Sequence, residues 1–398
     1  MDNAWLKTNT TSKQLQKIWL NCTIICKEMK ITIVQGAFFP IPAVLGGAVE
    51  KMWYGLAKEF VKNGHEVYYI SKSYEGFLNI EREEGIDHIR VKGYKSPSSG
   101  ILLKILDLFY TLKAVQKISN NTDIIISNTF WLPIILPSNQ QKKCFIDVAR
   151  MPKGQMRFYT KSARIRANSS PVAKAIKDEI SIKYFDKVIM IPNTLPFKNT
   201  NTVDFLTKEK IILYTGRIHR EKGLDILINS FSLLGTEEWQ LCIVGPYSIE
   251  SGGGGNTYLE ELKILAKNSN VAFLEPIFDI DKLSEIYSKA SIFVYPSVAE
   301  KGETFGVSPL EAMSWGCATI VSNLECFKDF LIHNKNGLCF DHRSKNRVEI
   351  LSQFLDDLIN NPKLMNELAT EGLIVNETHS TEKLATEFLK EFELIASK

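Results

Sequence analysis

The sequence predicts an α/β protein made of two Rossmann-like, doubly wound parallel-sheet domains that face each other across a cleft. Its 398 residues suffice for roughly two or three domains of ordinary size. Short apolar runs alternate with helix-like stretches, a pattern typical of βαβ units. The pattern stops once, at 192–202, where proline and small polar residues predict an interdomain linker, and then begins again.

The first half supplies the elements of one such domain. A strand is expected at 31–36, then a loop, Gly46-Gly47 and a helix over 48–62 that Asn63-Gly64 ends. The amphipathic stretch 101–118 predicts a second helix. Four further apolar runs predict strands, at 65–71, 86–93, 123–128 and 144–148, and a last one lies at 187–193.

The second half repeats the pattern. Helices are expected over 224–234, 258–267 and 281–290. Apolar runs predict buried strands at 211–216, 240–245, 271–275, 292–296, 318–321 and 338–340. The final helix, 382–395, has one apolar face and therefore needs a surface to cover.

These elements predict the domain organisation. We expect an N-terminal domain at 29–196, a C-terminal domain at 197–380, and a last helix at 381–398 that packs back on the N-terminal domain. Residues 1–28 differ from the rest and are expected to be a poorly ordered extension, or to precede the true start of the protein. Their apolar patch is too short to span a bilayer, although it could touch a membrane.

Composition excludes several classes of protein. The hydrophobic content of 44% and the charged content of 23% are those of a soluble globular protein. The net charge of +3 gives no reason to expect nucleic-acid binding. Seven scattered cysteines without zinc-ligand spacing indicate free thiols in a reducing compartment. A cytoplasmic location is therefore expected.

Two segments of the second half carry chemistry. One is the stretch Tyr214-Thr-Gly-Arg217-Ile-His-Arg-Glu-Lys222-Gly223, and the other is Glu303-Thr-Phe-Gly-Val-Ser-Pro-Leu-Glu311. A pyrophosphate needs fixed cations, sugar hydroxyls need carboxylates that accept hydrogen bonds, and both need glycines where the backbone comes close. These segments supply all three and predict a sugar-nucleotide pocket.

The expected strand ends bring these groups together. Gly216-Arg217 follows the first strand of the second half, Gly245 follows the second, and Glu303 follows the strand at 292–296. Gly46-Gly47 follows the first strand of the first half and opens a helix, whose free N–H groups favour an anion. Because ligands of doubly wound folds bind at the carboxyl ends of the strands, we expect one interdomain site.

From Met29 almost to its end, the chain resembles glycosyltransferase family 4, retaining enzymes of the GT-B fold. The second half carries the specific part of the resemblance: Gly216-Arg217 with Lys222-Gly223, Ile243-Val-Gly245, the two glutamates and Glu311-Ala-Met-Ser-Trp-Gly. The first half matches through Gly46-Gly47-Ala-Val-Glu and Asn63-Gly64-His65-Glu-Val. Each piece is weak alone, but the ordered set is specific.

The resemblance implies a role for each of these residues. Arg217 and Lys222 would clamp the diphosphate, and a charge-assisted contact of about 1.5–3 kcal/mol outweighs a helix dipole of about 0.3–1 kcal/mol. Glu303 would lie beside the transferred hexose, and Glu311 would bind the ribose hydroxyls. Further donor contacts are expected from Gly46, Gly47, Gly216, Gly245, Ile277, Thr304, Phe305, Gly306 and Val307, the last three through backbone N–H groups.

The resemblance also marks a departure. Members of the family often have a histidine at the end of the strand that corresponds to 144–148, whereas this chain has Asp147 there. Asp147 is therefore a further candidate catalytic residue, with a role in binding a sugar hydroxyl. Asp279-Ile-Asp281 imitates a metal-binding pair but precedes a helix, so that a helix cap is the better interpretation. No metal and no cofactor beyond the nucleotide sugar is expected.

The expected function is retaining transfer of a hexose from a nucleotide-diphosphate sugar to a sugar or a lipid-linked glycan, as in cell-surface polysaccharide or glycoconjugate biosynthesis. An epimerase or phosphorylase of the same fold, or a non-catalytic nucleotide-binding homologue, remains an alternative. A dehydrogenase is disfavoured because Gly-x-Gly-x-x-Gly follows the first strand of neither half.

Three other features leave alternatives open. The basic stretch 150–187 could contact an anionic acceptor or the inner face of a membrane, or it could be a solvated helix face. The run at 252–255 is either a mobile flap or a surface loop. His65 is interpreted as structural, whereas His219 lies inside the phosphate loop and is left open.

Overall fold

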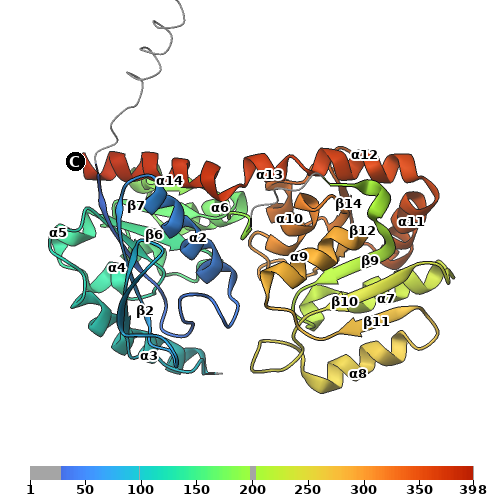
Figure 1. Ribbon diagram of the computed structural model, residues 1–398, viewed down its shortest axis with the longest axis horizontal. Helices are drawn as coiled ribbons and strands as arrows, with labels where there is room; N and C mark the ends of the chain where they lie inside the picture. Colours follow the sequence, from blue (N-terminus) through green and yellow to red (C-terminus); the bar gives the residue numbers. More distant parts are fainter. Residues whose placement is uncertain (1–27, 98, 198–202, 398) are drawn as a thin grey trace, which may run out of the picture.

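The computed structural model describes residues 28–397 except 98 and 198–202, and it confirms the predicted fold class. Two sheets form two α/β domains that lie side by side (Figure 1). The first has eight strands in the order β3-β4-β2-β1-β5-β6-β7-β8, and the second has six in the order β11-β10-β9-β12-β13-β14. The expected extension 1–28 lies outside the described residues, apart from Glu28.

The sheet of the N-terminal domain is parallel except at one edge, where β3 and β4 form an antiparallel pair. Its strands are β1 (Lys30–Val34), β2 (Glu66–Lys72), β3 (Ile80–Glu83), β4 (Ile86–Val91), β5 (Ile124–Ser127), β6 (Cys144–Val148), β7 (Arg164–Ala167) and β8 (Val188–Met190). Its helices are α2 (Ala48–Lys62), α3 (Gly100–Val115), α4 (Leu132–Ile135), α5 (Ser138–Gln141) and α6 (Ser170–Glu179).

The C-terminal domain has an all-parallel sheet. Its strands are β9 (Glu209–Thr215), β10 (Gln240–Val244), β11 (Val271–Leu274), β12 (Ala290–Tyr295), β13 (Ala318–Ser322) and β14 (Leu338–Phe340). Its helices are α7 (Leu224–Leu233), α8 (Gly255–Leu265), α9 (Ile280–Lys289), α10 (Val307–Ser314), α11 (Arg347–Asn360), α12 (Pro362–Gly372) and α13 (Val375–Thr378). All six residues of β12 are buried, as expected for a central strand covered on both faces.

The last helix, α14 (Thr381–Ala396), returns to the N-terminal domain and packs along α2. The ring centroids of Trp53 on α2 and Phe388 on α14 lie 5.1 Å apart. Figure 1 shows the red C-terminal helices running along the top of both domains. This helix therefore ties the two domains together a second time, independently of the linker.

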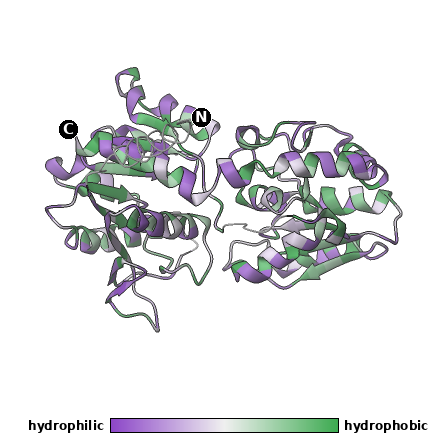
Figure 2. Ribbon diagram, turned by 45° about the horizontal axis from the view of Figure 1, so that its top comes forward, coloured by the Kyte–Doolittle hydropathy of each residue, from purple (hydrophilic) through white to green (hydrophobic). Residues whose placement is uncertain are grey.

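The two faces of the N-terminal sheet have separate cores. Buried side chains of α2 and α14 cover one face, and α3 and α6 cover the other. Figure 2 shows the hydrophobic colour concentrated in the strands of both domains and the hydrophilic colour on the outer faces of most helices. Within the part of the chain that the structure describes, no helix is both long enough and apolar enough to cross a bilayer.

Two strands were not predicted from the sequence. β3 forms a short edge hairpin with β4, and three of its four residues are charged. β7 lies inside the basic stretch, with the sequence Arg164-Ile-Arg-Ala167, but the side chain of Arg166 is fully buried. Charged residues hide the hydrophobic pattern of a strand when a buried partner neutralises them.

Candidate active site

A buried ion pair lies at the centre of the predicted site. Lys222 ends a short 3-10 turn, η4 (Arg220–Lys222), and its ammonium donates a hydrogen bond to the Glu303 carboxylate at 2.7 Å. The exposed fractions of the two side chains are only 7% and 10%. Gly223 permits this turn, because a Cβ atom there would lie 2.2 Å from the Pro296 carbonyl oxygen. The fold thus brings together two predicted catalytic residues that lie 81 positions apart in the sequence.

Arg217 lies closer to the surface than Lys222. Its guanidinium donates to the Gly252 carbonyl at 2.6 Å and to Glu221 at 2.8 Å, and 43% of its side chain is exposed. Burial raises the pKa of Tyr214 well above its usual range, Glu303 raises it further, and Arg217 lowers it. The charges of Glu303 and Arg217 therefore both act on the Tyr214 hydroxyl group.

The glycine run at 252–255 is packed onto Arg217. The Gly253 N–H donates to the Ser248 carbonyl, the Gly254 N–H to the Ile218 carbonyl and the Gly255 N–H to the Tyr247 carbonyl. The bond to Ile218 joins the loop to the segment 214–223, whereas the other two bonds close the loop on itself. With the bond from Arg217 to the Gly252 carbonyl, the glycine run forms one wall of the Arg217 environment in this structure.

Gly216 and Gly245 allow two strand ends to meet. Their φ angles are 149° and 154°, in a region that side-chain-bearing residues rarely adopt. A Cβ atom on Gly245 would lie 1.9 Å from the Gly216 carbonyl oxygen. The backbones after β9 and β10 can approach this closely only because both positions are glycine.

Glu311 is buried on α10 and is held by the tyrosine of a neighbouring helix. The Tyr287 hydroxyl donates to the Glu311 carboxylate at 2.8 Å and lies 2.5 Å from the Thr215 hydroxyl. Burial raises the pKa of Glu311 to about 7, while the bond from Tyr287 and the charge of Lys51 oppose this rise. Lys51 belongs to α2, so a cation of the N-terminal domain lowers the pKa of Glu311.

The segment 303–307 runs from the ion pair to the domain junction. Thr304 donates a hydrogen bond through its hydroxyl to the Ala149 carbonyl of the N-terminal domain at 3.0 Å. The Phe305 side chain is buried in the core, so only its backbone is free for a donor contact. Gly306 caps α10 with a φ of 88°, and Val307 is the first residue of that helix. Free N–H groups at the start of α10 thus lie next to Glu303.

The predicted residues of the N-terminal side lie at the same junction. A Cβ atom on Gly46 would lie 3.4 Å from the Phe278 ring. The Lys51 ammonium donates to the Phe278 carbonyl at 3.4 Å. Ile277 packs against the core of the C-terminal domain, and Gly47 has a φ of 102° directly before α2. The Gly-Gly turn therefore faces the loop that contains Ile277, one of the expected donor contacts.

The structure gives Asp147 a different place from the predicted one. Its carboxylate accepts a 2.6 Å bond from Arg166 and a 2.8 Å bond from the Trp53 indole. Both side chains of the Asp147–Arg166 pair are fully buried. A carboxylate with no exposed surface cannot reach a sugar, so we reassign Asp147 from catalysis to the internal structure of the N-terminal domain.

Sequence reasoning missed the acid that does lie near the Gly-Gly turn. Glu50, in the first turn of α2, accepts a hydrogen bond from the Gln35 amide at 3.0 Å. Burial raises its pKa, while the bond from Gln35 and the charge of Arg150 lower it. Glu50 stands in the quoted Gly46-Gly47-Ala-Val-Glu segment. Its position three residues after Gly47 was the available signal.

The remaining sequence candidates have structural roles. His65 accepts a hydrogen bond from the Met29 N–H, and His219 accepts one from the Glu221 N–H. Asp279 caps α9, as predicted, by accepting from the Lys282 N–H at 2.9 Å. In the described ranges, no cluster of three or more His, Cys, Asp and Glu side chains has an arrangement suited to a metal ion.

The basic stretch 150–187 does not form one cationic face. Arg164 pairs with Glu391, Arg166 is buried against Asp147, and Lys187 donates to the Thr160 and Ser162 carbonyls. Lys174 pairs with Asp178 on α6. Much of the charge that the sequence concentrates here is therefore used within the protein.

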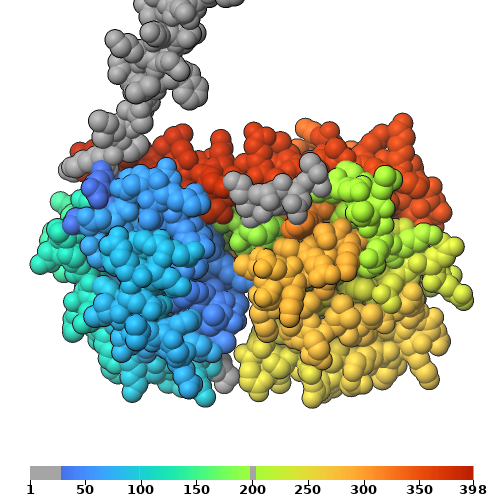
Figure 3. Space-filling model, in the orientation of Figure 1, coloured from blue at the N-terminus to red at the C-terminus, as the bar shows by residue number. Residues whose placement is uncertain are grey.

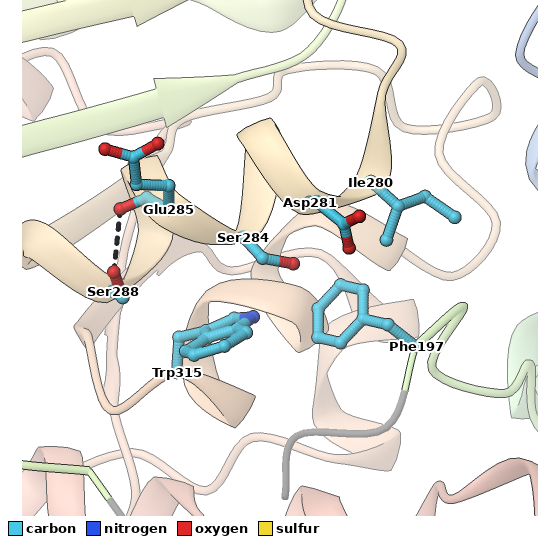
Figure 4. Close-up of a pocket in the computed structure, with 7 residues that line it drawn as sticks. All are labelled: Phe197, Ile280, Asp281, Ser284, Glu285, Ser288 and Trp315. Atoms are coloured by element: carbon cyan, nitrogen blue, oxygen red, sulfur yellow. Dashed lines mark hydrogen bonds between the residues drawn. The ribbon is translucent and has the colours of Figure 1, made fainter. Parts of the chain in front are cut away.

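A separate pocket of about 410 Å³ lies on α9, away from the predicted site residues (Figure 4). The Phe197 and Trp315 rings, 5.9 Å apart between centroids, form one side of it. The other side consists of α9 residues: Ile280, Asp281, Ser284, Glu285 and Ser288. It contains none of the residues that the sequence assigned to donor binding.

Comparison with known proteins identifies the C-terminal domain. Residues 198–373 match the family model of glycosyl transferases group 1. The matched segment spans most of the C-terminal domain, which is less than half of the whole chain. It contains the ion pair, Arg217 and Glu311, so the predicted site lies in the part of the chain that defines this family.

Curated relatives of this chain are named as glycosyltransferases. An uncharacterized glycosyltransferase of Methanocaldococcus jannaschii, MJ1607, is 26% identical over 412 residues, covering 91% of this chain and all of that protein. An uncharacterized glycosyltransferase of Haemophilus influenzae is 30% identical over 205 residues, half of this chain and 52% of the relative. The capsular polysaccharide biosynthesis glycosyltransferase CapM of Staphylococcus aureus is 25% identical over 41% of this chain and 40% of its own length.

Solved structures share the two-domain fold of this glycosyltransferase. Sucrose-phosphate synthase from Thermosynechococcus elongatus has a TM-score of 0.74 at 18% identity, covering 93% of this chain and all of that one. Anabaena Alr3699/HepE, solved in complex with UDP and glucose, has a TM-score of 0.68 at 17% identity, covering 91% and 99%. At such identities the likeness establishes the GT-B fold.

Proposed function

We propose that the protein is a retaining hexosyltransferase of glycosyltransferase family 4, which moves a hexose from a nucleotide-diphosphate sugar to a sugar or lipid-linked glycan. The Lys222–Glu303 pair carries this proposal. A buried cation and a buried acid at the junction of two domains, beside the free N–H groups of α10, fit a ligand that has both a phosphate and a hexose.

Each group has a distinct task in the proposed reaction. As the bond between the hexose and the diphosphate breaks, negative charge develops on the diphosphate, and Lys222 and Arg217 stabilise it. The α10 N–H groups at Gly306 and Val307 add to this stabilisation. Glu303 accepts hydrogen bonds from the hexose, and Glu311, steadied by Tyr287, accepts them from the ribose.

Retention is proposed to follow from attack by the acceptor on the face from which the nucleotide leaves. Because Asp147 is buried inside the N-terminal domain, Glu50, which lies beside the Gly-Gly turn, is the acid of this domain that we assign to the acceptor side. We propose that Glu50 positions an acceptor hydroxyl. Its raised pKa lets the carboxyl group take up a proton more readily than a solvated glutamate does.

The donor and acceptor classes rest on relatives. Structures of the structurally similar Anabaena protein contain UDP and UDP-glucose, which supports a nucleotide-diphosphate sugar as the donor. One relative is named for capsular polysaccharide biosynthesis, which supports a glycan acceptor. We propose a cytoplasmic enzyme that works at the inner face of a membrane. The stretch 150–187 can contribute only those lysines and arginines that are not bound internally, such as the exposed Arg150 and Arg157.

A two-step experiment tests this function. Thermal unfolding with uridine, guanosine and adenosine diphosphates identifies the base, since a bound ligand raises Tm. Proton NMR of the product formed from the matching α-linked nucleotide sugar and a glycan acceptor then reports the anomeric configuration. We expect an α-linked product. A β-linked product would reject retention, and no Tm shift with any nucleotide would reject the donor site.

The alternatives predict different products. An epimerase of this fold releases free nucleotide from the donor without an acceptor, and a phosphorylase consumes inorganic phosphate. A non-catalytic homologue binds the nucleotide and transfers nothing. Because Lys222 and Glu303 are both present and paired, we favour the transferase over the non-catalytic homologue.

A further inference from the structure

Helix α3 presents an apolar strip to solvent instead of to the core. Five large side chains on it have exposed fractions between 44% and 76%: Ile101, Leu102, Ile105, Phe109 and Leu112. At about 100° per residue, these positions fall within one arc of about 100°. A single exposed leucine needs no explanation, whereas a contiguous apolar strip on a helix marks an interaction surface.

The opposite side of α3 already has a partner. Tyr110 and Ala114 are fully buried in the core of the N-terminal domain, and Asp107 accepts from the Phe130 N–H at 3.0 Å. The helix is therefore fixed to the domain by one face. The strip on the other face stays largely exposed after folding.

Charge around the strip is uniformly positive. Lys104 lies about 60° beyond one edge of the arc and Lys113 about 20° beyond the other, a geometry in which long side chains reach past an apolar face. Lys92, Lys95 and Lys117 flank the helix in the sequence, and all five are partly or fully exposed. The one acid between 92 and 117 is Asp107, and it is buried.

Neighbouring loops extend the same surface. The Trp131 indole donates to the Lys104 carbonyl at 2.7 Å, which fixes an amphipathic ring beside the helix. The Tyr94 N–H donates to the Ala37 carbonyl, next to the exposed Phe39 side chain. Figure 1 shows α3 at the lower edge of the N-terminal domain, remote from the C-terminal helix α14.

We propose that α3 docks the protein on an anionic lipid surface, lying in the plane of the headgroups with its strip inserted. An apolar arc between lysines, without an exposed acid, fits that surface better than a second copy of this chain, whose identical lysines would oppose one another. The helix follows β4, so its first turn lies at the strand ends that face the domain junction. Docking would bring that junction close to the membrane.

Vesicle co-sedimentation of the full chain tests the proposal. We expect binding to vesicles of phosphatidylcholine with about one third phosphatidylglycerol, weaker binding to phosphatidylcholine alone, and loss of binding between about 0.1 M and 0.5 M salt. The double variant Ile105→Glu/Phe109→Glu should bind about tenfold or more weakly, because two charges would have to enter the headgroup layer. Both side chains are exposed, so Tm should stay within about 2 °C.

The control is Ile264→Glu on α8, an isoleucine of the C-terminal domain that is more exposed than Ile105 and Phe109, and this variant should bind vesicles like the wild type. Equal binding of wild type and double variant would overturn the proposal, as would absence of binding to anionic vesicles. Light scattering measures the oligomeric state of both proteins. If the wild type is a dimer and the double variant a monomer, the strip mediates self-association and the proposal is wrong. Turnover of a water-soluble acceptor should be unchanged in all three proteins, which separates this proposal from the proposed function.

Discussion

The two sides of the domain junction use their charges in opposite ways. On the C-terminal side, Lys222, Glu303 and Glu311 are held by neighbours but keep a small exposed surface, of 7–10%. On the N-terminal side, Asp147 and Arg166 neutralise each other inside the domain. Figure 3 shows the two domains meeting along a narrow line. Under the proposed function, this difference means that donor binding depends on fixed ionic groups, whereas the acceptor side has few of them.

Replacing the cation of the ion pair should give the largest effect. Lys222→Ala removes the charge that stabilises the departing diphosphate, so we expect kcat to fall about 10²–10³-fold. Steady-state kinetics of the variant and the wild-type enzyme with the same nucleotide-sugar donor measure this fall in kcat. Lys210→Ala, which removes an exposed cation paired with Glu238, should leave kcat within about twofold.

Loss of folding must be separated from loss of catalysis in this case, because Lys222→Ala leaves Glu303 buried and unpaired. The double variant Lys222→Met/Glu303→Gln has no unpaired charge and should regain stability while staying inactive. Recovery of turnover in the double variant would show that the pair is structural, and the contrast between the two sides of the junction would disappear.

The buried pair of the N-terminal side should behave in the reverse way. Arg166→Met leaves Asp147 buried without its cation, so we expect a loss of about 3–5 kcal/mol in the free energy of unfolding. Denaturant titration measures it, and Lys174→Met, at an exposed pair on α6, should cost less than about 0.5 kcal/mol.

Turnover then decides the role of Asp147. Asp147→Asn/Arg166→Met removes both charges and should keep kcat within about threefold of the wild type at a temperature where the variant is folded. A folded double variant without activity would return Asp147 to the catalytic site and contradict our reassignment.

Glu311 provides a test that depends on pH. Its pKa rises from 4.5 to about 7 on folding, so the folded state holds a proton that the unfolded state releases between these values. The free energy of unfolding must therefore fall as pH rises from 4.5 to 7, by about 1.4 kcal/mol per pKa unit and by about 3 kcal/mol at most. Glu311→Gln should remove this part of the pH dependence.

Urea titrations at pH 4.5, 6 and 8 measure the slope. Glu50 and Asp107 also have raised pKa values, so the wild-type slope includes their contributions and only the difference between proteins belongs to Glu311. Glu349→Gln, at an exposed acid of α11, is the control and should keep the wild-type slope. An unchanged slope in Glu311→Gln would mean that this acid stays ionised in the fold.

The sequence predicted the fold, and it selected residues of the C-terminal domain that the structure brings together, because both depend on local patterns. Alternating apolar runs gave most strand positions within a few residues, and the segments around Lys222 and Glu303 combine their glycines and charges within short stretches. Asp147 was misplaced because its partner Arg166 belongs to another strand, and no local pattern reveals that pairing. β7 was missed for the same reason. The exposed strip of α3 could not be predicted either, because the sequence does not show which face of this apolar helix is buried.

The smallest expected effect compares one glycine from each domain. Gly306 and Gly64 have nearly equal φ angles, 88° and 86°, so an alanine carries the same backbone strain at both. A Cβ atom at Gly306 would lie 2.4 Å from the Phe327 ring, whereas at Gly64 it would meet nothing within 4 Å. We therefore expect Gly306→Ala to lower the free energy of unfolding by about 1–3 kcal/mol more than Gly64→Ala does. Because Gly306 precedes α10, the same variant should also weaken nucleotide binding, and equal effects of the two alanines on stability and binding would show that the start of α10 is not built to approach a ligand.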